Sequence, residues 1–293
     1  MVDGLVVVDK EPAWTSHDAV ARCRRIFGQK RVGHAGTLDP DATGVLLVGL
    51  GRATRLLRFL TPLPKTYVAE VVLGVATSTL DASGEVVGTW DMSGVMIDDV
   101  RNAATALTGS ILQVPPMVSA VKVGGKRLHE LARAGVEVER EPRPVTVHRF
   151  EVAATDEAAV VAIEVECSSG TYVRTLAADL GQAMGGGAHL RNLRRTAIGS
   201  FDQSMARTLS ELEAQSDTAV LPPAEALRGY ASVVVEGELI DAVAHGKVLS
   251  RATFGGGVGG EGPWAVLDHA GSLLAVYEAH RGGDLKPAVV MAG

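Results

Sequence analysis

Residues 33–57 read GHAGTLDPDATGVLLVGLGRATRLL and hold the densest pattern in the chain. Glycines and the pair Asp39-Pro40 make residues 33–44 rich in turn formers. The apolar run VLLVGLG that follows is typical of a buried strand. The sequence therefore predicts a tight, glycine-rich loop directly before a core strand.

Strands and helices are predicted on both sides of this loop. Residues 4–8 (GLVVV) indicate a buried strand, and HDAVARCRRIF, after a cap at Thr15-Ser16, indicates an amphipathic helix. Because strands and helices mix without a strict β-α-β repeat, the pattern favours an α+β or mixed α/β fold. The other predicted elements are strands over 65–75, 144–153 and 159–167 and helices over 97–108, 127–135 and 172–184.

A domain boundary is expected near residues 220–231, where Leu221-Pro222-Pro223 and Gly229 interrupt the pattern. The segment after it predicts one helix, ELIDAVAHG, and several short strands around the bend FGGGVGGEG. We therefore predict a main domain over 1–229 and a small β-rich domain over 230–293. A domain of that size has little core of its own and should pack on the main body.

Composition narrows the class of protein. The chain has 293 residues, 46% of them hydrophobic and 21% charged, enough for one large core with a small appendage. No apolar run approaches the roughly 18 residues of a membrane helix, and the N-terminus does not resemble a signal peptide. Cys23 and Cys167 are too few for a disulfide framework or a metal cluster. We expect a cytoplasmic protein without a metal or other cofactor.

Charge is unevenly distributed along the chain. The formal net charge is −6, yet basic residues outnumber acidic ones in 1–65, 120–149 and 170–207. These blocks could converge into one basic face that binds nucleic acid. On charge alone, ordinary alternation over a solvated surface explains the pattern equally well.

The loop at 33–44 lacks the signatures of the common ligand-binding loops. It has neither the Lys-Ser/Thr ending of a P-loop nor the G-x-G-x-x-G spacing of a dinucleotide fold. Asp39 and Asp41 have no Glu at the twelfth loop position, so the segment is not an EF-hand. The residues alone leave open a tight surface loop and a cradle for phosphate.

A family resemblance decides between these alternatives. Residues 33–57 resemble the signature loop of the bacterial TruB family of pseudouridine synthases, which modify the T-loop of tRNA. The resemblance covers residues 4 to about 200, and residues 230–293 resemble a PUA-type RNA-binding domain. It implies a mixed, mainly antiparallel central sheet flanked by helices. The other motifs, in the family's order, are DKEPAWTSHDAV, KTYVAEVVLGVATSTLDASGE, VPPMVSAVKVGGKRLHELARAGVEVEREPRPVTV, SSGTYVRTLAADLG and GAHLRNLRRTAIG.

The resemblance also implies a catalytic set. Asp39 matches the family's essential aspartate, which attacks the ribose or base of the target uridine or stabilises charge there. Arg174 matches its arginine partner, whose planar guanidinium keeps a buried carboxylate ionised. Tyr67 matches the tyrosine that stacks on the target base and is proposed to shuttle a proton. The reaction isomerises uridine at position 55 without a cofactor.

RNA-binding residues follow from the same resemblance. A stacked base must leave its helix before it reacts, and His34 matches the residue that fills the vacated place, while Tyr172 and Leu193 would line the pocket. An insertion over about 122–145 would grip the T-arm. The predicted basic contacts are Lys122, Lys126, Arg127, Arg133, Arg191, Arg194 and Arg195.

Two rival functions and one departure from the family pattern accompany this hypothesis. An RNA-folding chaperone could keep the synthase body without depending on catalysis, and an aspartate-dependent nucleoside hydrolase would release free uracil. Where the family has Pro-x-Gly, this chain has Glu11-Pro12-Ala13, which affects local loop geometry more than activity. No heptad pattern demands an oligomer, and a monomer without an obligate protein partner is expected.

Overall fold

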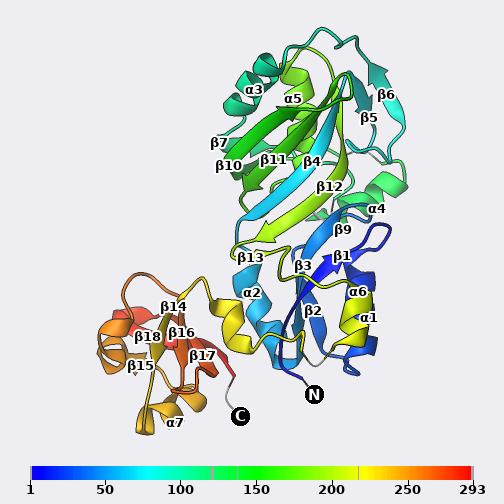
Figure 1. Cartoon of the computed structure of the whole chain (residues 1–293). Coiled ribbons are helices and arrows are strands. Elements are labelled where there is room, and N and C mark those ends of the chain that lie inside the picture. The colour runs from blue at the N-terminus through cyan, green and yellow to red at the C-terminus, as the bar shows by residue number, and fades with distance from the viewer. Residues whose placement is uncertain (1, 120–121, 137, 217, 292–293) are drawn as a thin grey trace. The chain divides into compact units, whose positions relative to one another are not determined.

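The computed structural model describes residues 2–119, 122–136, 138–216 and 218–291. The chain divides into two compact units (Figure 1). The first unit comprises Met1–Leu63 and Ile198–Gly293, and the second comprises Pro64–Ala197.

The first unit combines the N-terminal strands with the C-terminal third of the chain. In chain order its elements are β1 (Gly4–Lys10), α1 (Ser16–Ile26), β2 (Val32–Ala35), β3 (Thr43–Leu50), the 3-10 helix η1 (Gly51–Leu56), α2 (Leu57–Leu60), β13 (Phe201–Asp202), α6 (Leu209–Ala214), η2 (Pro223–Leu227), β14 (Ala231–Val234), α7 (Glu238–Ala244), β15 (Leu249–Ser250), η3 (Arg251–Gly257), β16 (Trp264–Leu267), β17 (Leu273–Ala279), η4 (Arg281–Gly283) and β18 (Asp284–Val290).

Strand β3 forms the centre of the N-terminal sheet. It pairs antiparallel with β1 and with β2, so that both Leu5 and Gly33 lie opposite Gly49. Side chains of β1 and β3 alternate between two cores: Val6 packs in a cluster with residues of α1 and α6, and Val7 in one with residues of η1 and α2. Because both faces are covered, an uninterrupted apolar run such as VLLVGL is the expected strand sequence.

The C-terminal segment builds its own five-stranded sheet, in the order β14-β16-β17-β18-β15. Strand β14 runs parallel to β16, and the other pairs are antiparallel. Trp264 and Tyr277 are fully buried in its core, and α7 contributes Val243. Ala265 and Val276 also join the cluster that contains Leu5 and Val7, so this sheet shares a core with the N-terminal strands.

The second unit is built on a larger antiparallel sheet. Strand β11 pairs with β4 and β10, β10 pairs with β7, and β12 lies beside β4. Helices α3 and α5 lie next to each other beside this sheet (Figure 1). The elements in chain order are β4 (Lys65–Leu73), β5 (Val75–Thr77), β6 (Val86–Thr89), α3 (Ile97–Ala106), β7 (Gly109–Gln113), β8 (Lys122–Val123), β9 (Lys126–Arg127), α4 (Leu128–Arg133), β10 (Arg143–Ala154), β11 (Val160–Cys167), α5 (Val173–Ala183) and β12 (Ala188–Ile198).

These sheets confirm the predicted fold class, a mixed and mainly antiparallel α+β architecture with a small β-rich C-terminal part. The sequence prediction was incomplete: β2 falls inside a stretch expected to be only turns, and strands β6, β12 and β13 and helix α6 were not predicted. The predicted division at 229/230 stays a prediction, because the first unit contains residues from both sides of it.

Candidate active site

Asp39 lies on the loop that joins β2 to β3, in the first unit. Gly36 (φ 83°) and Gly44 (φ 98°) take the left-handed backbone conformation at the two ends of this loop, where a side chain would be strained. The backbone N–H of Ala42 donates to the carbonyl of Asp39 at 3.2 Å, which closes a turn over residues 39–42. Asp39 itself is half-buried. The glycines thus allow a sharp loop that carries two carboxylates, the half-buried Asp39 and the exposed Asp41.

Lys10 holds this loop from the end of β1, and sequence reasoning assigned it no role. Its side chain is 0% exposed, and its Nζ donates to the carbonyls of Trp14 at 2.7 Å, Pro40 at 2.8 Å and Glu11 at 2.9 Å. An ammonium group has three donor hydrogens, which match these three acceptors. The contact with Pro40 fixes the residue directly after Asp39.

The Glu11-Pro12-Ala13 departure leaves this contact intact. Lys10 binds the main-chain carbonyls of Glu11 and Trp14, and a carbonyl is present whatever the side chain. The departure does have a backbone consequence, because Ala13 has φ 63°, where glycine is the unstrained residue. The Glu11-Pro12-Ala13 departure is therefore expected to lower stability and to leave the hydrogen bonds of Lys10 to the loop unchanged.

His34, predicted to fill the place of the extruded base, lies in β2 and is half-buried. Its ring meets that of His17, an exposed residue in the first turn of α1, edge to face with 5.4 Å between centroids. The register opposite Val48 of β3 fixes the backbone of His34. The contact with His17 restricts the orientation of the His34 ring, and no pattern in the sequence predicts it.

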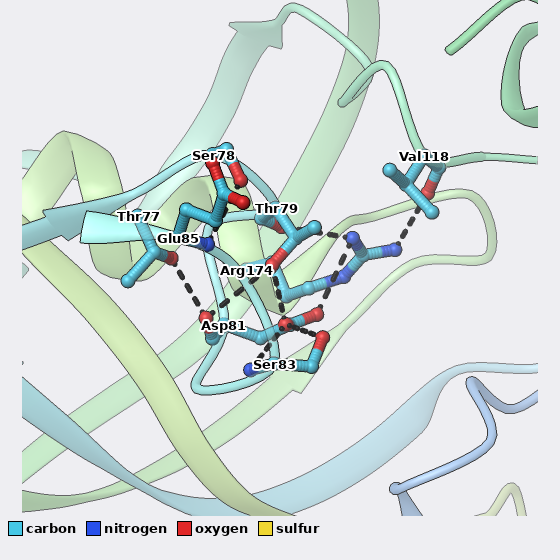
Figure 2. Close-up of polar contacts among 8 residues, drawn as sticks. All are labelled: Thr77, Ser78, Thr79, Asp81, Ser83, Glu85, Val118 and Arg174. Atoms are coloured by element: carbon cyan, nitrogen blue, oxygen red, sulfur yellow. Dashed lines mark hydrogen bonds and ion pairs between the residues drawn. The ribbon is translucent and has the colours of Figure 1, made fainter. Parts of the chain in front are cut away.

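Arg174 lies in the first turn of α5, in the second unit, and its side chain is 4% exposed. Its Nη1 donates to the carbonyl of Thr79 at 3.0 Å, and its Nη2 donates to the carbonyl of Val118 at 2.8 Å (Figure 2). The carboxylate of Asp81 stands 3.5 Å from Nη1. A guanidinium is rigid and planar, so three contacts fix both its position and its plane.

Asp81 faces the predicted catalytic arginine, and the sequence prediction assigned it no role. Its Oδ1 accepts from Thr79 Oγ1 at 2.6 Å, from Ser83 Oγ at 2.6 Å and from Ser83 N at 3.1 Å, while Oδ2 faces Arg174 (Figure 2). The segment TLDAS is an Asx turn, in which an aspartate binds the backbone two residues on. The sequence alone is enough to predict this turn, but not to predict that its aspartate faces Arg174.

Tyr67 and Lys65 share one face of β4, whose residues alternate between buried and half-buried. The side chain of Tyr67 is 8% exposed. Burial, together with the neighbouring Arg195 cation, lowers the pKa of Lys65 to about 8. Arg195 lies on β12 and is also fully buried. Lys65 and Arg195 therefore place two basic groups near the predicted catalytic tyrosine.

Tyr172 and Leu193, the other predicted pocket residues, are half-buried. The amide of Gln113 holds the backbone of Tyr172 from β7, because its Oε1 accepts from Tyr172 N at 2.7 Å and its Nε2 donates to Tyr172 O at 3.1 Å. Gln113 is itself buried. It therefore fixes the residue that precedes α5 and Arg174, and sequence reasoning missed it.

The predicted RNA-binding cations divide into three groups. Arg191 binds Glu70 at 2.6 Å and also pairs with Glu157, so a phosphate would have to displace these carboxylates. Arg194 is half-buried, and Arg195 is fully buried. The remaining side chains lie outside the part of the chain that the structure describes: Lys122, Lys126, Arg127 and Arg133.

Asp39 and Arg174 belong to different units, so their predicted pairing stays a prediction. Among the described residues, no group of three His, Cys, Asp or Glu side chains could hold a metal ion. No described helix is long and apolar enough to cross a membrane. Burial raises the pKa of both Cys23 and Cys167 to about 11, which leaves neither as a thiolate nucleophile at neutral pH.

Comparisons with known proteins place this loop and helix in a family. A family model described as the N-terminal domain of TruB family pseudouridylate synthase matches residues 24–173, which include Asp39 and Tyr67. The chain belongs to the TruB family. A second model, described as a tRNA pseudouridylate synthase B C-terminal domain, matches residues 174–229 and begins at Arg174.

Relatives within the TruB family align with nearly the whole chain. A tRNA pseudouridine synthase B of Rhodococcus jostii (strain RHA1) is 47% identical over 279 residues, covering 94% of this chain and 90% of that one. One from Thermobifida fusca (strain YX) is 47% identical over 302 aligned residues, covering 100% of both. The solved structure described as a Cbf5-Nop10-Gar1 complex matches with a TM-score of 0.75 at 28% identity, over 99% of this chain and 84% of that chain. The resemblance read from the motifs is confirmed.

Proposed function

We propose that this protein isomerises uridine to pseudouridine in tRNA, at position 55 of the T-loop. The observation that supports this most directly is the TruB family match over 24–229, with relatives named tRNA pseudouridine synthase B aligned along nearly the whole chain. Within that match, Asp39 stands on a loop whose main chain is tied to β1. A reacting carboxylate needs such a fixed position, because misplacement by about 1 Å can cost about 100-fold in rate.

In the proposed reaction, Asp39 attacks the nucleoside or stabilises the charge that forms when the bond between N1 and C1′ breaks. The uracil turns over, a bond forms between C5 and C1′, and the proton on C5 leaves to solvent while N1 gains one. No electron is transferred, so the step needs no redox cofactor. Tyr67 would carry the proton, and Arg174 would keep Asp39 ionised, since its guanidinium stays charged when buried.

RNA recognition is proposed for the residues around this centre. His34 would occupy the place of the extruded base, and Tyr172 and Leu193 would line the pocket. The insertion over about 122–145 and the domain over 230–293 would hold the T-arm. Arg195 can reach a phosphate only if the site opens, because it is fully buried. We further propose that the protein acts in the cytoplasm as a monomer.

The decisive experiment incubates the purified protein with an unmodified tRNA transcript that carries tritium at C5 of uridine, with a chelator present. We expect release of one tritium per tRNA and a single pseudouridine at position 55. Asp39→Asn should abolish both while tRNA affinity stays within a few-fold, because amide and carboxylate have nearly the same shape. A transcript with cytidine at position 55 is the matched control.

Other outcomes would favour the rivals. Free uracil in the supernatant would identify a nucleoside hydrolase. If the wild type formed no pseudouridine yet accelerated tRNA folding, and Asp39→Asn did so equally well, the protein would be an RNA chaperone. Equal loss of binding and catalysis in Asp39→Asn would contradict the role assigned to Asp39.

A further inference from the structure

Ser16 makes two hydrogen bonds to a single residue of the Asp39 loop. Its Oγ accepts from the backbone N–H of Leu38 at 2.8 Å and donates to the carbonyl of Leu38 at 3.3 Å, across 22 residues of sequence. Ser16 is 0% exposed and Leu38 is buried as well, so water cannot replace these bonds. Leu38 directly precedes Asp39 in the chain.

The hydroxyl of Ser16 is not needed to start the helix in which it lies. Thr15 is the N-cap of α1: its Oγ1 accepts from Asp18 N at 3.1 Å, and Asp18 Oδ2 accepts from Thr15 N at 2.9 Å. This reciprocal capping box is complete without Ser16. A buried hydroxyl beside a complete cap is therefore explained by the loop it holds rather than by the helix.

Ser16 and Lys10 act on opposite sides of the same residue. Ser16 binds the main chain of Leu38, and Lys10 Nζ donates to the carbonyl of Pro40 at 2.8 Å. With both neighbours fixed, the backbone of Asp39 has little freedom to rotate. These contacts all lie within the first unit.

We propose that Ser16 is a positioning residue, which fixes the Leu38 peptide so that the Asp39 carboxylate stands where the reaction needs it. Ser16 touches neither RNA nor the reacting atoms in this role. The inference rests on the proposed synthase function, since it concerns the placement of Asp39. It predicts that loss of the hydroxyl slows the chemical step and leaves tRNA binding unchanged.

The test compares Ser16→Ala with Thr15→Ala as the matched control. Thr15→Ala removes the neighbouring hydroxyl and one cap of the same helix, so it lowers the melting temperature without loosening Leu38. Single-turnover rate, tRNA Kd and melting temperature are measured for both. Ser16→Ala should reduce the single-turnover rate about 10- to 100-fold with Kd within about twofold, whereas Thr15→Ala should retain the wild-type rate.

Three results would overturn the inference: a wild-type rate in Ser16→Ala, a rate loss in Thr15→Ala that equals it, or a Kd that rises as much as the rate falls. Should Ser16→Ala fail to fold, Ser16→Cys keeps a small polar group with weaker hydrogen bonds, and its rate should fall between those of alanine and wild type. If the wild type itself forms no pseudouridine, the proposed function fails. If the wild type is active and Ser16→Ala is equally active, only the role of Ser16 fails.

Discussion

The two units hold their central charged residues in different ways. In the first unit, the residues before and after Asp39 are fixed through main-chain atoms, by Ser16 and Lys10. In the second unit, Arg174 is fixed through its own side chain, by two carbonyls and by Asp81. The first set of contacts acts on the main chain beside Asp39, whereas the second acts on the guanidinium itself. Substitutions should therefore act on backbone placement in one unit and on charge placement in the other.

The largest effect is expected from Arg174→Ala in the second unit. It removes the donor to the carbonyls of Thr79 and Val118 and the cation that faces Asp81, and a hydrogen bond to a charged group typically contributes about 1.5–3 kcal/mol. We expect the rate of pseudouridine formation to fall at least about 100-fold, as measured by tritium release. Arg101→Ala is the control, since its ion pair with Asp98 is exposed and worth about 1 kcal/mol or less. A wild-type rate in Arg174→Ala would remove this arginine from the mechanism.

In the first unit, Lys10→Met should cause the next largest loss. Methionine has a similar length but no donor, so the carbonyls of Glu11, Trp14 and Pro40 lose the ammonium group. A hydrogen bond to a charged group contributes about 1.5–3 kcal/mol, and water can replace part of this at the exposed Glu11 and Pro40, so the free energy of unfolding should fall by about 3 kcal/mol. Urea titration measures it, and Lys30→Met, at an exposed lysine, should change it by less than about 0.5 kcal/mol. Similar midpoints of urea unfolding for Lys10→Met and Lys30→Met would contradict the stabilising role of the three Lys10 hydrogen bonds.

Lys65 should make the free energy of unfolding rise with pH. Its pKa falls from 10.5 to about 8 through burial and the Arg195 cation, so the folded protein binds the proton less tightly than the unfolded chain. Between those two values the unfolded chain holds more protons, and this lysine adds stability as pH rises. The free energy of unfolding of the wild type, minus that of Lys65→Met, should rise by about 2–3 kcal/mol from pH 7 to pH 10.5. A flat or falling difference would refute the shift.

The strands and helices with a clear period were predictable from the sequence. Of the strands expected over 4–8, 65–75 and 159–167, the first lies within β1, the second covers β4 and runs past its end at Leu73, and the third covers β11. Strand β2 escaped because its four residues, VGHA, take their structure from pairing with β3 rather than from their own pattern. Strand β12 escaped because Asn192, with φ 56°, breaks the alternation in an arginine-rich segment.

The candidate site could be predicted only where side chains carry a motif. Asp39, Tyr67 and Arg174 lie in segments that resemble family motifs, and their catalytic roles stay predictions. Lys10 escaped because its acceptors are main-chain carbonyls, which leave no trace in the sequence. Asp81 was not predicted because the turn that contains it is far from Arg174 in the sequence. Thr79 of that turn and Arg174 are 95 residues apart, and no local sequence pattern covers such a separation.

Asp81→Asn removes the negative charge that faces Arg174 and keeps the shape of the side chain. The asparagine oxygen can still accept from Thr79 and Ser83, but the net attraction to Arg174 is lost. Because Asp81 is partly exposed and 3.5 Å from Nη1, we expect a loss of about 1–2 kcal/mol, or about 5- to 30-fold in the single-turnover rate. The tRNA Kd should stay within about twofold. A rate loss equal to that of Arg174→Ala would mean that Asp81 acts directly in the chemistry.

Ala13→Gly, in the segment between β1 and α1, should have the smallest effect, a gain in the free energy of unfolding. Alanine at φ 63° bears the strain of the left-handed conformation, about 1–2 kcal/mol, and glycine removes it. Glycine also increases the entropy of the unfolded chain, so the net gain should be about 0.5–1 kcal/mol. The side chain of Ala13 makes none of the contacts by which Lys10 and Ser16 hold the loop, so the single-turnover rate should not change. A gain in stability together with an altered single-turnover rate would show that backbone strain at Ala13 affects the position of Asp39. The hydrogen bonds of Lys10 and Ser16 to the loop would then transmit this strain as well as fix the loop.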